Sequence, residues 1–110
     1  MKYQIETIPY FQKRAKRLIK KFPSLKKELL ELHNKLSADP ETGTALGKNC
    51  YKIRLAIKSK NKGKSGGARV ITYLYIRGKV VYLLDIYDKS EQSDITNKEL
   101  VELLSEISNK

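Results

Sequence analysis

The residues of this sequence best suited to chemistry form a run of basic side chains between positions 48 and 69. The run holds eight lysines and arginines and no carboxylate: Lys48, Lys52, Arg54, Lys58, Lys60, Lys62, Lys64 and Arg69. Such a run attracts a polyanion, and nucleic acid is the commonest polyanionic partner of a basic protein. A solvated, flexible loop beside a charged strand is the alternative. The spacing of Lys52 and Arg54, which a strand places on one face, favours the binding interpretation.

Tyrosines accompany this charge on the predicted strands, at Tyr51, Tyr73, Tyr75, Tyr82 and Tyr87. A tyrosine beside a basic groove can stack on an unpaired RNA base. Most of these positions suit the core. Tyr87 differs, because it ends the last predicted strand just before a polar segment, and we expect it to face solvent and a ligand.

The other reactive residue types are too few for most kinds of catalytic or metal site. His33, the only histidine, lies in a helical segment rich in lysine and leucine, which excludes a histidine-pair ribonuclease and a multi-histidine metal site. Cys50, the only cysteine, is interpreted as a structural thiol. Four carboxylates form the only acidic cluster, within and just after the last predicted strand. They could hold Mg²⁺, but they equally suit the start of a helix: Asp85, Asp88, Glu91 and Asp94. We therefore expect no metal and no other cofactor.

Helices are predicted in the first third of the chain and again near its end. After a short strand within residues 1–8, Pro9 begins a helix, and Pro23 ends it. Ser24 is placed to cap a second helix, which ends before Asp39, so the two helices form a hairpin. The last helix begins at a capping box formed by Thr96 and Glu99. Apolar residues at helical spacing support all three helices.

Between the helices, the period of the apolar residues changes from helical spacing to two. Residues 51–57 alternate as a half-buried strand, residues 70–76 form a second strand, and residues 80–87 form a central strand that is apolar at nearly every position. A loop is expected from residue 39 through Gly47. The resulting order is β-α-α-β-β-β-α, an α+β fold with a small, mainly antiparallel sheet. No linker divides the chain, so residues 1–110 form a single domain.

The charge of the whole chain is uneven. In 110 residues, 23 basic and 12 acidic side chains give a formal charge of +11. Residues 1–69 carry 18 basic and 5 acidic side chains, hence +13, and residues 70–110 carry 5 and 7, hence −2. No apolar run is long enough for a signal peptide or for the roughly 20 residues of a membrane span. We expect a cytoplasmic protein without membrane contact.

Three stretches together resemble a known family: CYKIRL at Cys50–Leu55, the arginine of GGARVITYLY at Arg69, and KVVYLLDIYDKSEQSDIT at Lys79–Thr96. They are similar to the RelE/ParE superfamily of bacterial toxins from type II toxin-antitoxin systems, closest to its HigB-like branch. The resemblance implies a RelE-like fold with a helical hairpin on one side of a twisted sheet. It also implies an mRNA endoribonuclease that acts in the ribosomal A site, through attack of a 2′-hydroxyl without a metal. An antitoxin, the ribosome and mRNA would be its partners.

The resemblance assigns roles to residues of the basic run. Lys52 and Arg54 match a pair of basic active-site positions, and Arg69 matches the arginine that holds the scissile phosphate. Three further lysines would extend the RNA-binding surface: Lys58, Lys62 and Lys64.

Two further positions of the resemblance lie at the end of the last strand and just after it. Lys89 matches a basic active-site residue, with Ser90 as the alternative register. Tyr87 would replace the tyrosine that RelE carries near its final helix, where this sequence has Thr96. Two other functions remain open: a ParE-like toxin that inhibits DNA gyrase without nuclease activity, and a noncatalytic RNA-binding module.

Overall fold

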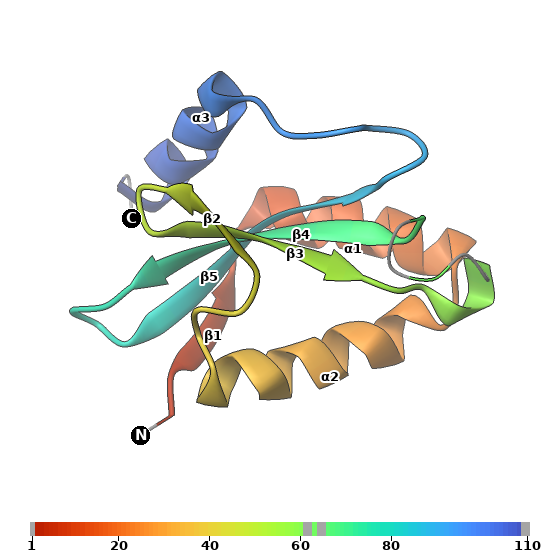
Figure 1. Ribbon diagram of the computed structural model, residues 1–110, viewed down its shortest axis with the longest axis horizontal. Helices are drawn as coiled ribbons and strands as arrows, with labels where there is room; N and C mark the ends of the chain where they lie inside the picture. Colours follow the sequence, from red (N-terminus) through yellow and green to blue (C-terminus); the bar gives the residue numbers. More distant parts are fainter. Residues whose placement is uncertain (1, 61–62, 64–65, 109–110) are drawn as a thin grey trace.

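The computed structural model describes residues 2–60, 63 and 66–108. Its elements are β1 (Gln4–Thr7), α1 (Pro9–Lys21), α2 (Leu25–Ala38), β2 (Thr44–Gly47), β3 (Cys50–Leu55), the short 3₁₀ helix η1 (Lys58–Lys60), β4 (Ala68–Tyr75), β5 (Val80–Asp88) and α3 (Asn97–Ser108). Figure 1 shows α2 below a twisted sheet, and α3 with the segment that precedes it above the sheet. The predicted α+β class is confirmed.

Within the described residues, the strands form one sheet in the order β1-β5-β4-β3-β2. All neighbouring strands are antiparallel except β1 and β5, which are parallel, so the prediction of a mainly antiparallel sheet is confirmed. β5 lies between β1 and β4, and its residues from Leu83 to Asp88 are all buried. This explains why its sequence is apolar at nearly every position.

The predicted loop from residue 39 through Gly47 is wrong at its end, where the chain forms β2. Thr44–Gly47 pairs with the start of β3 in a hairpin whose two turn residues, Lys48 and Asn49, have φ of 56° and 61°. Two positive φ values define the type I′ turn that matches the twist of paired strands. The turn lacks the Asn-Gly or Asp-Gly sequence by which such hairpins are usually recognised. A four-residue strand with one half-buried side chain also carries little apolar periodicity.

Helix ends follow the predictions in two cases and depart from them in one. Pro9 occupies the first turn of α1, as predicted. Thr96 and Glu99 form the predicted capping box, in which each backbone N–H donates to the other residue's side chain at 2.9 and 3.1 Å. Ser24 stands at the start of α2 but makes no capping hydrogen bond. Its hydroxyl instead donates to Glu28 and contacts the hydroxyl of Ser59 in η1.

The two faces of the sheet have different surroundings. Side chains such as Ile53, Val70 and Ile86, which are adjacent across β3, β4 and β5, join the core with apolar residues of α1 and α2. Because side chains alternate along a strand, the residues between them point to the opposite face. That face carries the predicted site.

Candidate nucleic-acid interface

Two rows of side chains cross the sheet on the face opposite the helical hairpin. In the first row, Arg54 of β3 is paired with Arg69 of β4, and Arg69 is paired with Tyr87 of β5. In the second row, Lys52 is paired with Ile71, and Ile71 with Asp85. Paired residues of antiparallel strands have Cβ atoms about 5 Å apart on one face. The structure therefore brings together four of the residues predicted to act on RNA: Lys52, Arg54, Arg69 and Tyr87.

The pairing of Arg54 with Arg69 does not stabilise the fold. Like charges directly opposite each other in a sheet are destabilising. Arg54 is exposed, whereas only 5% of Arg69 is exposed, and Arg69 donates to the carbonyl oxygen of Ala68 at 3.2 Å. Guanidinium groups in this arrangement suit a bridging anion with oxygens on more than one side, such as a phosphodiester.

The prediction that Tyr87 faces solvent is wrong. Only 1% of its surface is exposed, and within the described residues its hydroxyl has no hydrogen-bond partner. Burial raises the pKa of Tyr87 to about 12, with the negative charge of Asp94 adding to the rise and Arg69 opposing it. The phenol is thus neutral near pH 7 and can act as a donor but not as a base.

Residues 89–96, here called the covering segment, lie between β5 and α3 and cover this end of the face (Figure 1). Lys52 donates to a carboxylate oxygen of Asp94 at 3.2 Å. Lys89, predicted to act on RNA, donates to the carbonyl oxygen of Ser93 at 2.7 Å and so holds the covering segment in its fold. Ser90, the alternative at that register, has its hydroxyl bonded to Lys60 at 2.7 Å.

The four carboxylates considered for a metal each pair with a different basic residue. The pairs are Asp85 with Arg14 at 3.0 Å, Glu91 with Arg17 at 3.1 Å, Asp94 with Lys52 at 3.2 Å, and Asp88 with Lys60. Among the described residues, no group of three histidine, cysteine, aspartate or glutamate side chains is arranged to hold a metal ion. The carboxylates act as separate anchors for the chain around the site.

Asp85 has a poorer partner than its distance to Arg14 suggests. The Nε hydrogen of Arg14 points to the carbonyl oxygen of Ile86 at 3.0 Å, so Oδ1 of Asp85 lies close to the charge without receiving a hydrogen bond from the described residues. Burial raises the pKa of Asp85 from an ordinary 3.8 to about 6, against the opposing charge of Arg14. Arg14 of α1 therefore covers the edge of β5 at Asp85 and Ile86, beyond the residues of β5 that pair with β1.

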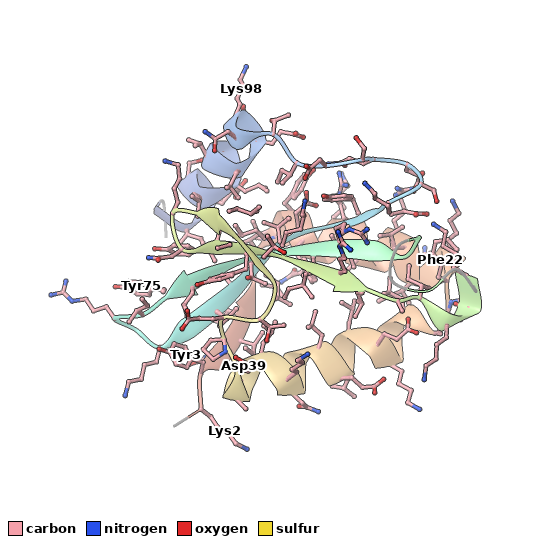
Figure 2. The ribbon with its side chains drawn as sticks, viewed as in Figure 1. Lys2, Tyr3, Phe22, Asp39, Tyr75 and Lys98 are labelled. Carbon is pink, nitrogen blue, oxygen red and sulfur yellow. The ribbon has the colours of Figure 1, made fainter. Side chains whose placement is uncertain are left out.

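Lys60 anchors the loop after β3 to the end of β5. Its amine donates to Asp88, and the side chains of the two residues are 10% and 2% exposed. The same amine lies 5.6 Å from the ring centroid of Phe22, which Figure 2 labels at the α1–α2 junction. This pair could not be predicted from the sequence, because no local pattern joins residues 28 positions apart.

Of the three predicted RNA-binding lysines, the structure describes Lys58, and it does not lie with the two rows. Lys58 lines a cavity of about 260 Å³ between α2 and β3, together with Glu28 and Glu31. Its backbone N–H donates to Glu28 at 2.7 Å, which fixes the start of η1 to α2. Lys62 and Lys64 lie outside the described residues.

The only histidine and the only cysteine are as predicted. His33 is exposed on α2. Cys50 is fully buried, and burial raises the pKa of its thiol to about 11, which keeps it protonated and unreactive. No helix in the described ranges is both long and apolar enough to cross a membrane.

Comparisons with known proteins give the family. A family model described as the RelE toxin of the RelE/RelB toxin-antitoxin system matches residues 9–110. Among solved structures, a double mutant of the E. coli toxin RelE in the free state is similar, with a TM-score of 0.60 and 18% sequence identity. The match covers 97% of this chain and 99% of that one. At this identity the structural likeness shows the fold, while the family model spans nearly the whole sequence. The chain therefore belongs to the RelE toxin family, whose members are paired with an antitoxin.

Proposed function

We propose that this protein is a ribosome-dependent endoribonuclease that cleaves mRNA in the ribosomal A site and so inhibits translation. One observation carries the proposal: Arg54, Arg69 and Tyr87 form a continuous row across three strands, beside Lys52. The row has no carboxylate, and it presents two guanidinium groups and a neutral phenol on one face. A phosphodiester is the ligand that best matches this set.

The reaction uses the RNA, these side chains and solvent water. The 2′-oxygen of a ribose attacks the adjacent phosphorus, the bond from phosphorus to the 5′-oxygen breaks, and a cyclic phosphate and a 5′-hydroxyl result. The 2′-hydroxyl loses its proton to solvent water, and the leaving 5′-oxygen takes a proton from the hydroxyl of Tyr87, which solvent then reprotonates. Arg54 and Arg69 stabilise the negative charge that develops on the phosphorus oxygens, which is the largest contribution that such donors make to catalysis.

Tyr87 supplies a proton donor in the same row. Its hydroxyl is neutral near pH 7, as a phenol with the ordinary pKa of 10 already is, and burial and the charge of Asp94 raise that pKa further, to about 12. The hydroxyl has no hydrogen-bond partner within the described residues. A donor of such high pKa transfers protons inefficiently, so positioning of the mRNA must supply much of the rate. This need for positioning supports dependence on the ribosome.

Cleavage of mRNA on purified ribosomes tests the proposal, with 5′ ends mapped at nucleotide resolution. Arg69→Ala should remove about 2 to 4 kcal/mol of transition-state stabilisation, or about 30- to 900-fold in rate. Arg77→Ala is the matched control, because Arg77 is exposed in the turn at the far end of the same hairpin. We expect the control to cut like the wild type.

Two results would contradict the proposal at different levels. A folded Arg69→Ala variant with full activity would remove Arg69 from the site. Intact mRNA in cells that express the wild type, combined with signs of DNA damage, would instead support inhibition of gyrase.

A further inference from the structure

The site described above is covered in the free protein by part of its own chain. Tyr87 is 1% exposed and Arg69 5% exposed, although both lie on the face turned away from the helical hairpin. The covering segment lies over this face, and Figure 1 shows it running from the end of β5 toward α3. A phosphodiester can therefore contact the exposed Arg54 but cannot reach Arg69 and Tyr87 unless this segment moves.

The covering segment is held at three places. Next to the end of β5, the amine of Lys60 donates to the hydroxyl of Ser90 at 2.7 Å, and the backbone N–H of Lys89 donates to the carbonyl oxygen of Gly67 at 3.0 Å. Toward α1, the guanidinium of Arg14 donates to the side chain of Gln92 at 2.9 Å, and Arg17 pairs with Glu91 at 3.1 Å. Toward the sheet, the carboxylate of Asp94 accepts from Lys52 at 3.2 Å and from its neighbouring backbone N–H at Ile95, at 2.8 Å. The contact with Lys52 is the one that involves a residue of the proposed site.

The carboxylate of Asp94 lies beside a cation of the proposed site. It contacts the amine of Lys52, and its charge acts on the hydroxyl of Tyr87, which also lies in the field of Arg69. A carboxylate and a phosphodiester share the features that lysine recognises, a negative charge and acceptor oxygens. The side chain of Asp94 is 61% exposed and that of Lys52 is 24% exposed, so the pair is weak enough for RNA to displace it.

We propose that Lys52 forms an anion subsite for a phosphodiester of single-stranded RNA, and that Asp94 occupies this subsite in the free protein as an internal competitor. RNA binding breaks the ion pair of Lys52 with Asp94 and uncovers Arg69 and Tyr87. The inference rests on the proposed function, because it assumes that the substrate is RNA. In this interpretation, Asp94 lowers the affinity of the protein for RNA, because the RNA phosphodiester must first displace its carboxylate from Lys52.

Titration of the isolated, ¹⁵N-labelled protein with a 2′-O-methylated RNA trinucleotide, which cannot react, tests the inference. NMR signals of the Ile95 and Lys52 amides report on the subsite alone, whatever binds to the basic helices. In the wild type, both signals should shift together with one dissociation constant. Asp94→Asn should tighten that constant about two- to five-fold, the range expected when an exposed ion pair is removed.

The matched control is Glu91→Gln, which removes the same charge from the same segment but breaks an ion pair with α1. A purely electrostatic effect of net charge would tighten binding equally in both variants and would overturn the inference. So would a shift at Lys52 without a shift at Ile95, or failure of the two signals to saturate in every variant. In an Asp94→Asn background, Lys52→Ala should abolish the gain in affinity. Because no ribosome is present, these outcomes are separate from the loss of mRNA cleavage that would refute the proposed function.

Discussion

Asp85→Asn should make the stability of this protein less dependent on pH. Asp85 is 3% exposed, and it lines a cavity of about 190 Å³ between α1, β5 and α3. The groups that face it are the cation of Arg14 and three further carboxylates of the cavity wall: Glu99, Glu102 and Glu106. Arg14 is too poorly aligned to offset the burial of the charge.

The raised pKa of Asp85 determines how the stability changes with pH. Burial raises the pKa of Asp85 from 3.8 to about 6, so the folded protein holds this proton more tightly than the unfolded chain. Asp85 therefore costs little at pH 4 and becomes increasingly destabilising as the pH rises through 6. A shift of about two pKa units corresponds to about 3 kcal/mol at high pH. Between pH 5 and pH 7.5, the free energy of unfolding should fall by about 1 kcal/mol more in the wild type than in Asp85→Asn.

Urea unfolding at pH 5 and at pH 7.5, followed by circular dichroism, measures this difference. The variant also loses the contact with Arg14, which lowers its free energy of unfolding at both pH values. The measurement that tests the prediction is therefore the change in the free energy of unfolding between pH 5 and pH 7.5. Glu102→Gln is the control, because Glu102 lines the same cavity but is exposed on α3. A difference between wild type and Asp85→Asn that is equal at the two pH values, or larger at pH 5, would refute the reasoning.

Two further substitutions test other buried groups. Tyr87→Phe should raise the free energy of unfolding by about 1 kcal/mol, since it removes a buried hydroxyl without a described partner, and should slow mRNA cleavage on ribosomes if the hydroxyl donates the proton. A loss of stability would mean that the hydroxyl is hydrogen-bonded in the folded protein. Asp88→Asn should cost about 3 kcal/mol, because it leaves the amine of Lys60 buried without a counter-charge. Urea unfolding of Asp88→Asn, Lys60→Met and the double variant should show losses that do not add; additive losses would contradict direct coupling.

The basic members of the two rows could be predicted from the alternation of side chains along a strand and the pairing of neighbouring strands. Alternation along β3 places Lys52 and Arg54 on one face, and the antiparallel neighbour brings Arg69 to the same face. The type I′ turn at Lys48 and Asn49 could not be predicted in the same way, since its sequence lacks the usual glycine.

The burial of Tyr87 depends on contacts between distant parts of the chain. From the sequence, a tyrosine before a polar segment indicates exposure. The covering segment folds back over it because Gln92 binds Arg14, 78 positions earlier, and Asp94 binds Lys52, 42 positions earlier. Local patterns contain no information about either contact, so the sequence predicts the members of the site but not its closed state.

The parallel pairing of β1 with β5 also determines when the protein can fold during its own synthesis. Gln4 pairs with Val80, 76 residues later. At about 5 to 20 residues per second, the ribosome needs about 4 to 15 s to make the intervening chain. Throughout that time β1 lacks its partner, and Arg69 and Tyr87 have not been joined in one sheet. A chain released before β5 is complete therefore contains both helices of the hairpin and most of the basic residues, yet it lacks the surface that could act on the ribosome that made it.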